Sequence, residues 1–338
     1  MTTAASSLPR QTGDVATPCA LCGASAFSRL WPSPTGNGPN GHFTVATCST
    51  CGLARTEPQL EEADLAPYYT ATYYGGNTQK FTGLFESAVG LLCNMRAPGI
   101  VRAARQSSKQ CSRSSPRILD VGCGRGTVAR VLARKGCECH GIERGEFPPE
   151  GTPEGVVLHR EALAHIGFDE AYFDLVLLWH SLEHMSNPVD TLRQCRRILS
   201  PSGSLVLGVP NFGSWQSHWF GDRWFHLDLP RHTHHFTRTT LSRCLTEAGF
   251  RVSSVSTVTI EQNLLGFVQS AQNRFIPGTG DQRLYELMKP QNHAHSWSKR
   301  LVPFGVAAAL LPVAVIETVL SALAGQGASL VVHARRSD

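Results

Sequence analysis

Short apolar runs alternate with helical patterns along the chain from residue 117 onward. The runs are four to eight residues long or slightly longer, as expected of buried strands, and helical patterns over residues 128–134 and 189–199 lie between some of them. The strand candidates are residues 118–121, 137–143, 156–159, 173–179, 204–210, 250–259 and 328–335. This alternation predicts an α/β fold built on a doubly wound sheet.

Two identical cysteine turns precede this region. Cys19 and Cys22 form one CxxCG sequence, and Cys48 and Cys51 form the other. A two-residue spacer lets both thiolates of a turn face one ion, and the following glycine tolerates a positive φ. The pattern predicts a zinc ribbon over residues 1–58, although four unrelated thiols are the alternative. The Zn²⁺ would be structural, because four sulfur ligands leave no position for a substrate.

Composition sets the broad class of the protein. The chain has 338 residues, of which 41% are hydrophobic and 17% charged, as is typical of a globular protein with one main domain and a small appendage. The net charge of +5 is spread along the chain, so no nucleic-acid partner is expected. The first residues contain no signal-like apolar run, so we expect a cytoplasmic protein, in which paired cysteines bind metal.

Between the ribbon and a main domain over 117–338, residues 59–116 are expected to form a helical connector or lid. Its sequence PYYTATYYGG carries tyrosines that either pack the ribbon against the main domain or cover a ligand. These residues are Tyr68, Tyr69, Tyr73 and Tyr74. The sequence QSSKQCSRSSPR, at residues 106–117, is expected to be a solvated loop.

The first strand of the sheet ends in a glycine-rich turn. In LDVGCGRG, Asp120 precedes glycines whose spacing matches neither the dinucleotide-binding GxGxxG nor the phosphate-binding GxxxxGK[ST] sequence. A carboxylate here would repel a pyrophosphate, but it can accept hydrogen bonds from an amino-acid ammonium. Glu143, at the tip of the second strand, is placed to hold both hydroxyls of a ribose. Together these residues predict a pocket for a nucleoside that carries an amino acid.

LDVGCGRG, Glu143 and FDLVLLWHSLEH together resemble the motifs of class I S-adenosylmethionine-dependent methyltransferases, over roughly residues 117–260 and the final strand. The resemblance implies a seven-stranded sheet whose last strand is antiparallel, and S-adenosylmethionine as cofactor. It also implies that the methionine end lies on the glycine turn and that the adenine lies near residues 161–162. The implied cofactor-binding residues are Asp120, Gly122, Cys123, Gly124, Glu143, Glu161, Ala162 and Trp179.

Residues 210–237 are expected to form the acceptor side, because they contain five histidines, three tryptophans and four phenylalanines. The predicted catalytic residues, as general base or as groups that orient the acceptor, are His180, His232 and His235. Each histidine alone could equally be structural. His180 and His184 also have the spacing of a metal-binding pair, and Asp228 with Arg231 could form an ion pair. The segment resembles a loop of bacterial methyltransferases that carry a zinc ribbon and occur with glycan and secondary-metabolite pathways.

An insertion at residues 260–327 separates the last two strands. Its stretch 301–325 has Glu317 as its only charge and is long enough to span a membrane. Both flanking strands must join one sheet, however, which excludes a single crossing, and Pro303 and Pro312 are expected to break the run. We expect a helical hairpin or cap that is buried, forms a homodimer contact, or lies in one leaflet at the inner face of the membrane.

These features favour methyl transfer from S-adenosylmethionine to a small-molecule, glycan-linked or lipid-linked acceptor, most simply at oxygen. Two alternatives stay open. One is a nucleotide-sugar C-methyltransferase, and the other is a non-catalytic zinc-ribbon binding protein on a methyltransferase scaffold. The intact acidic residues and glycines of the predicted cofactor pocket oppose the second alternative.

Overall fold

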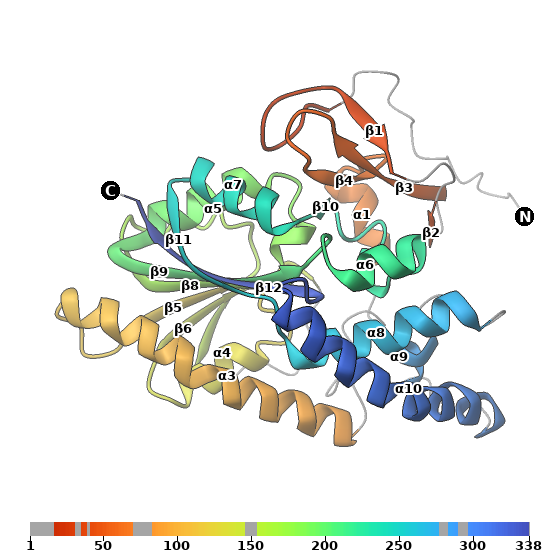
Figure 1. Cartoon of the computed structure of the whole chain (residues 1–338). Helices are drawn as coiled ribbons and strands as arrows, with labels where there is room; N and C mark the ends of the chain where they lie inside the picture. The colour runs from red at the N-terminus through yellow and green to blue at the C-terminus, as the bar shows by residue number, and fades with distance from the viewer. Residues whose placement is uncertain are drawn as a thin grey trace, which may run out of the picture.

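The computed structural model describes residues 17–30, 35–38, 41–69, 83–145, 154–276, 283–289 and 297–337. Its larger sheet has seven strands in the order β11-β12-β9-β8-β5-β6-β7 (Figure 1). The strands are β5 Arg117–Val121, β6 Glu138–Ile142, β7 Val156–His159, β8 Phe173–Trp179, β9 Leu199–Pro210, β11 Phe250–Ser256 and β12 Ser329–Arg336. Strand β12 runs antiparallel to both neighbours, and the other pairs are parallel. The predicted sheet, with its antiparallel last strand, is confirmed.

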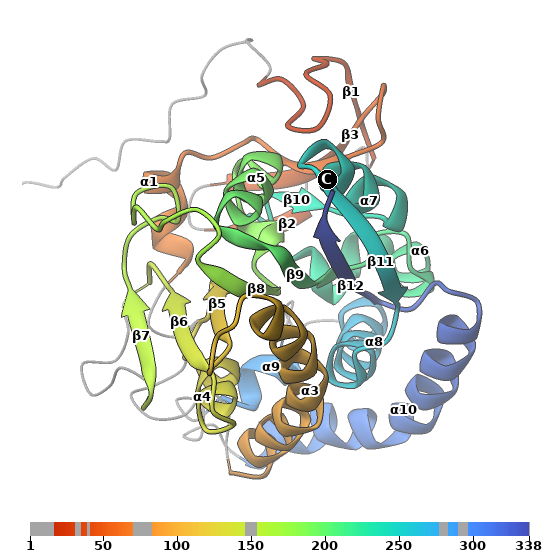
Figure 2. The same cartoon turned by 90° about the vertical axis from the view of Figure 1, so that its left-hand side faces the viewer.

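Helices cover both faces of this sheet (Figures 1 and 2). The main helices of the described residues are α3 Gly83–Gln110, α4 Thr127–Ala133, α5 Pro188–Ile198, α6 Trp215–Phe220, α7 Arg238–Glu247, α8 Ile260–Phe275, α9 Arg283–Leu287 and α10 Trp297–Leu323. On one face, α3 and α4 bury Ile100 and Leu132 against Leu175 of β8. On the other, α5 and α7 bury Leu192 and Leu241. Helices α6 and α8 follow the carboxyl ends of β9 and β11, where ligands bind in such folds.

A second, smaller sheet belongs mainly to the N-terminal cysteine-containing segment. Its strands are β1 Phe27–Arg29, β2 Thr35–Gly38, β3 Gly41–Cys48, β4 Ala54–Glu57 and β10 His234–His235. Strand β10 comes from the histidine-rich segment of the main domain, and His234 and His235 pair antiparallel with Arg55 and Ala54. The ribbon sheet is therefore completed by the segment that the sequence assigns to the acceptor side.

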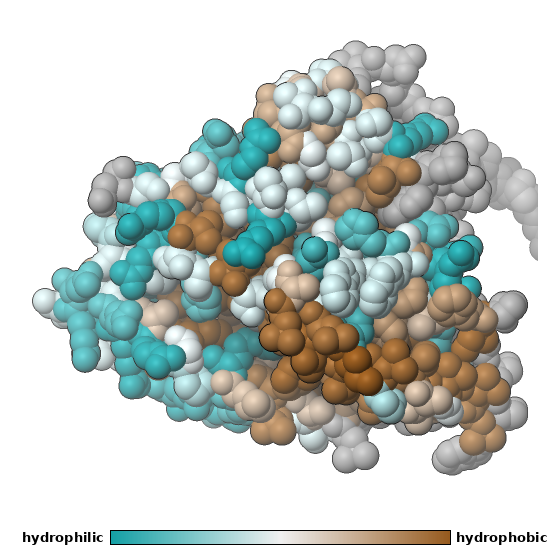
Figure 3. Space-filling model, in the orientation of Figure 1, coloured by the Kyte–Doolittle hydropathy of each residue, from teal (hydrophilic) through white to brown (hydrophobic). Residues whose placement is uncertain are grey.

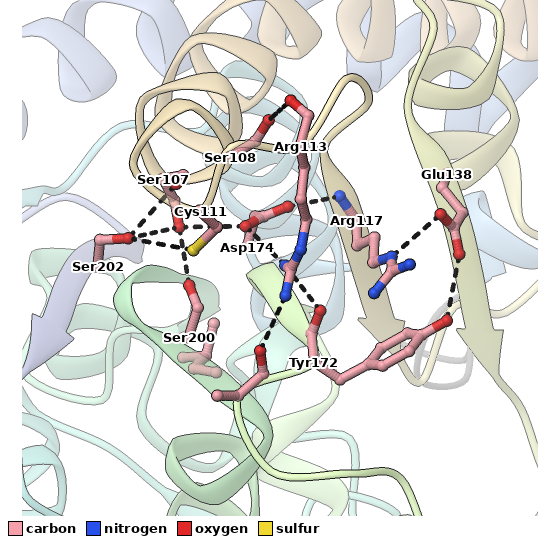
Figure 4. Close-up of polar contacts among 12 residues, drawn as sticks. Ser107, Ser108, Cys111, Arg113, Arg117, Glu138, Tyr172, Asp174, Ser200 and Ser202 are labelled. Atoms are coloured by element: carbon pink, nitrogen blue, oxygen red, sulfur yellow. Dashed lines mark hydrogen bonds and ion pairs between the residues drawn. The ribbon is translucent and has the colours of Figure 1, made fainter.

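The expectation of a solvated loop at residues 106–117 is wrong for its first part, because α3 continues to Gln110 and Ser107 and Ser108 are buried. Figure 4 shows the reason. Ser107 Oγ lies 2.9 Å from Ser200 Oγ, next to the fully buried carboxylate of Asp174. Asp174 accepts hydrogen bonds from Arg113 Nη1 at 3.0 Å and from the backbone N–H that begins β5 at 2.9 Å. This polar network fastens the end of α3 to the sheet.

Replacing Asp174 with alanine should lower the free energy of unfolding by about 3 kcal/mol, because it leaves the Arg113 guanidinium and a strand N–H without their acceptor. Urea denaturation measures the effect. The control is Asp190→Ala, which removes a solvent-exposed ion pair with Arg193 and should cost less than about 1 kcal/mol. Equal losses in the two variants would contradict a structural role for the network.

The insertion differs from the expected hairpin. Residues 297–323 form the single helix α10, with Pro303 and Pro312 both inside it, so the predicted break is wrong. Figure 2 shows that the helix bends instead of ending, which is how a helix accommodates the ring and missing N–H of proline. The helix packs along α8, but only 22% of its most apolar window is buried. Burial is therefore not the explanation of its apolar sequence.

Candidate functional site

The four cysteines of the two CxxCG turns meet at one point. Sγ of Cys19 lies 3.4 Å from Sγ of Cys51, and Sγ of Cys22 lies 3.6 Å from Sγ of Cys48. All four sulfur atoms are within 4.8 Å of one another. Tetrahedral Zn²⁺ with Zn–S bonds of about 2.3 Å requires sulfur atoms about 3.8 Å apart, so the donor set fits a structural zinc ion.

The carboxylate of Asp120 is buried at the carboxyl end of β5. Its Oδ1 accepts no hydrogen bond from any residue that the structure describes. Burial, together with the charge of Glu143, raises the pKa of Asp120 to about 7. Such an unsatisfied buried oxygen needs a donor from outside the protein, and a ligand ammonium or a bound water would supply it.

The glycine turn after Asp120 leaves room on one side. Gly122 has a φ of 72°, and a Cβ there would come within 2.5 Å of Cβ of Ser181. Gly124 has a φ of 53°, and a Cβ there would meet no atom within 4 Å among the described residues. Glycine is thus required at the first position by close packing, and at the second it borders space that a ligand can occupy.

Glu143 lies directly after β6 and closes the turn from the other side. Its Oε2 accepts a hydrogen bond from the N–H of Gly124 at 3.0 Å, and its Oε1 accepts one from Gly145 at 2.9 Å. Carboxylate oxygens have further lone pairs, so these bonds fix the group without using its full capacity as an acceptor. Cys123 lies between the two glycines, and its Sγ would contact a Cβ placed on Gly141 of β6.

Three further predicted cofactor residues lie at the same edge of the sheet. Glu161 and Ala162 follow β7, with Glu161 exposed and Ala162 half-buried. Trp179 ends β8, and the guanidinium of Arg96 stacks over its ring at 4.0 Å from the centroid. Arg96 in turn forms an ion pair with Glu261 of α8. Sequence analysis missed this Arg96–Glu261 pair, because neither residue belongs to a motif.

His180 follows β8 and has a left-handed backbone, with a φ of 53° that non-glycine residues rarely adopt. Its Nδ1 lies 3.4 Å from Oε1 of Glu183. The Glu183 side chain is buried, and neither of its carboxyl oxygens has a hydrogen-bond partner among the described residues. Burial raises the pKa of Glu183. The carboxylate and the imidazole therefore lie within ion-pair distance of each other.

His232 approaches the same carboxylate from the histidine-rich segment. Its Nδ1 is 2.9 Å from the carbonyl oxygen of His226, which can only accept, so Nδ1 carries the hydrogen and Nε2 is the basic nitrogen. Nε2 lies 3.9 Å from Oδ2 of Asp228 and 4.0 Å from Oε1 of Glu183. Burial lowers the pKa of His232. The expected ion pair between Asp228 and Arg231 is present, with Nε donating to Oδ2 at 2.9 Å.

His184 belongs to this cluster rather than forming a pair with His180. Its Nδ1 lies 2.9 Å from the hydroxyl of Tyr69. Burial lowers the pKa of His184 to about 4, so its imidazole is neutral near pH 7. The ligand atoms of Glu183, His184 and His232 lie within 4.8 Å of one another, a spacing that a metal ion could also occupy.

The ribbon supplies one wall of the cluster. Thr56 of β4 donates its hydroxyl to the carbonyl oxygen of His232, and its N–H donates to Thr233 O at 3.0 Å. The same hydroxyl lies 3.1 Å from Nε2 of His235, whose pKa burial lowers well below its ordinary value. His235 is thus a neutral, bonded side chain between the ribbon and the main domain.

The sequence leaves two roles open for the connector tyrosines, which are packing the ribbon against the main domain and covering a ligand. The two tyrosines that the structure describes differ in this respect. Tyr68 packs edge-on against Phe43 of the ribbon, with ring centroids 6.0 Å apart. Tyr69 instead reaches the histidine cluster, as its contact with His184 shows. Tyr73 and Tyr74 lie outside the described residues.

Comparison with known proteins agrees with this arrangement. A family model described as "Methyltransferase domain" matches residues 97–255. Ubiquinone biosynthesis O-methyltransferases are similar to part of the chain. That of Azoarcus sp. strain BH72 is 29% identical over 164 residues, which are 44% of this chain and 70% of the relative. That of Maricaulis maris is 34% identical over 130 residues, or 36% of this chain and 51% of the relative.

Among solved structures, a SAM-dependent methyltransferase from Archaeoglobus fulgidus matches with a TM-score of 0.45 and 18% identity, covering 73% of this chain and 94% of its own. The [4+2]-cyclase SpnF matches with a TM-score of 0.43 and 20% identity, covering 70% and 80%.

The family match covers the glycine turn, both acidic residues of the pocket and the end of β8. The buried oxygen of Asp120 and the open side of Gly124 fit a cofactor with an ammonium group at that position. The chain carries a methyltransferase domain over residues 97–255, and its four N-terminal cysteines fit a zinc-ribbon module.

Proposed function

We propose that this methyltransferase acts on a hydroxyl oxygen of a small-molecule or lipid-linked acceptor, with His180 as the general base. The contact between His180 and Glu183 at the end of β8 carries this proposal. An acceptor that arrives protonated needs a base, and an imidazole next to a buried carboxylate is such a base. The similarity to ubiquinone biosynthesis O-methyltransferases supports the same reaction.

The cofactor supplies an electrophilic methyl group on a sulfonium, so transfer is an in-line displacement. Asp120 would bind the ammonium of the methionine part, Gly124 would line its path, and Glu143 would accept hydrogen bonds from the ribose. Glu161, Ala162 and Trp179 would border the rest of the cofactor. These residues would hold the donor at the carboxyl ends of β5, β6, β7 and β8, and His180 directly follows β8.

His180 would take the hydroxyl proton as the new carbon–oxygen bond forms and the carbon–sulfur bond breaks. Glu183 would orient the His180 ring through Nδ1 and stabilise the imidazolium that results, as carboxylates do for catalytic histidines. The products are a methyl ether, S-adenosylhomocysteine and a proton that leaves to solvent. His232 and His235 would orient the acceptor, because both are buried and bonded to carbonyl or hydroxyl groups.

The His180→Ala variant should lower kcat by about 100-fold or more, and Glu183→Gln by about 10-fold to 100-fold. The assay measures methyl transfer to a panel of phenols and catechols with and without alkyl tails. Affinity for S-adenosylhomocysteine should change less than about 3-fold in both variants, because neither side chain belongs to the proposed cofactor pocket. His333→Ala, on β12 and separated from β8 by β9, serves as the control. A His180→Ala enzyme with wild-type kcat would refute the role of this residue.

A further inference from the structure

Helix α10 presents aliphatic side chains to solvent along its second half. By length and composition, residues 301–323 could cross a membrane, yet they lie on the surface of the molecule. Figure 3 shows the resulting apolar surface over this helix. Exposed fractions reach 58% for Ile316 and 82% for Leu323. The α10 apolar face consists of Val313, Val315, Ile316, Val319, Leu320 and Leu323.

The α10 apolar face is wider than a contact between two helices. At 100° per residue, its six side chains spread over about 160° of the helix circumference. The seam between paired helices is narrower, roughly 100° or less, so a second copy of α10 would leave part of this arc in water. Lipid chains surround a helix and can cover the whole arc.

The charge of the helix is turned inward. Glu317, the only charged residue between 301 and 325, is 4% exposed. Its Oε2 accepts a hydrogen bond from Nε2 of Gln216 on α6 at 2.8 Å. Placing a charged group in hydrocarbon costs free energy. Because the Glu317 carboxylate is buried inside the protein and hydrogen-bonded, it would not contact lipid chains. The α10 apolar face is thus free of charged groups.

The chain is attached to the domain at both ends of the insertion. Strand β12 begins at Ser329, six residues after α10 ends, and pairs with β9 in the central sheet. Helix α10 also packs along α8. The helix therefore cannot enter the bilayer end-on, and only its side can meet lipid. Trp219 lies on α6, one turn after Gln216, and about half of its side chain is exposed. Tryptophan is enriched at the boundary between membrane and water.

We propose that the α10 apolar face docks on one leaflet of a lipid bilayer, with the helix lying in the plane of the membrane surface. The protein then binds membranes without spanning them. This proposal is independent of the reaction chemistry, and its test uses no activity measurement.

Flotation of the full-length, zinc-containing protein with phosphatidylcholine vesicles tests the proposal. The wild-type protein should float with the vesicles. A double variant, Ile316→Glu with Leu320→Glu, should float at least about 10-fold less, because two charges would enter the apolar layer. The control is Val157→Glu, which places one carboxylate at an exposed valine on the edge strand β7 and should float like the wild type.

The proposal fails if the wild-type protein stays with the unbound fraction, or if the double variant floats equally well. Sedimentation without vesicles separates lipid from a second copy as the occupant. We expect a monomer for both proteins. A wild-type dimer that the double substitution dissociates would assign the α10 apolar face to a protein interface and overturn membrane docking.

Discussion

Asp120→Ala should weaken S-adenosylhomocysteine binding by about 100-fold, and the loss of methyl transfer should follow from it. A buried carboxylate paired with a ligand ammonium accounts for several kcal/mol of binding free energy, and each 1.4 kcal/mol is a factor of about ten. Calorimetric titration of the purified protein measures the affinity. Asp120→Asn, which keeps the shape of the side chain but not the charge, should lose a similar amount.

The Asp120→Ala substitution should not destabilise the ligand-free protein. Oδ1 of Asp120 accepts no hydrogen bond from the described residues, and burial raises the pKa of the carboxyl group. Removing an unsatisfied buried group relieves its desolvation, so Tm should stay equal or rise. Asp169→Ala, an exposed acidic residue after β7, is the control for both measurements. If the Asp120→Ala protein binds S-adenosylhomocysteine as tightly as the wild type, the ammonium group of the ligand does not contact Asp120.

Loss of the zinc ion should abolish most methyl transfer while leaving cofactor binding intact. Cys48→Ser removes one of four thiolates, and small zinc modules unfold without their metal. Thr56 would then lose its fixed contacts with the segment that carries His232 and His235, and we expect kcat to fall by about 100-fold. Zinc content by mass spectrometry and kcat are measured on the same sample.

The control is Cys111→Ser, because Cys111 lies outside the four-cysteine cluster. It should keep both zinc and kcat. S-adenosylhomocysteine affinity of the Cys48→Ser protein should change less than about 3-fold, since the glycine turn belongs to the other sheet. Full activity without zinc would show that the ribbon does not shape the acceptor side.

The features that sequence predicted well are those with local signals. Buried strands such as β8 are short apolar runs, and the zinc site consists of two identical turns that need only meet once. Asp120 and Glu143 each sit one or two residues from a strand end, so the sheet itself brings them together. Their joint position follows from topology, without knowledge of distant contacts.

Contacts between distant segments could not be predicted in this way. The hydrogen bond between Thr56 and His235 joins residues 179 positions apart, and no local pattern marks Thr56. Tyr69 reaches His184 across 115 positions. The sequence predicts a break at the prolines of α10, but the helix continues through both of them and packs along α8. In each case contacts between distant segments determine the structure, and sequence periodicity does not predict such contacts.

The fate of an isotope-labelled methyl group tests the central claim most directly. The enzyme is incubated with ¹³C-methyl S-adenosylmethionine and an alkylated catechol, and NMR identifies the atom that carries the label. We predict that the wild type forms a ¹³C-methyl ether. The His180→Ala variant should not form it, although its affinity for S-adenosylhomocysteine should be unchanged. Label on carbon or nitrogen, or equal ether formation by the variant, would contradict proton removal from a hydroxyl by the His180–Glu183 pair.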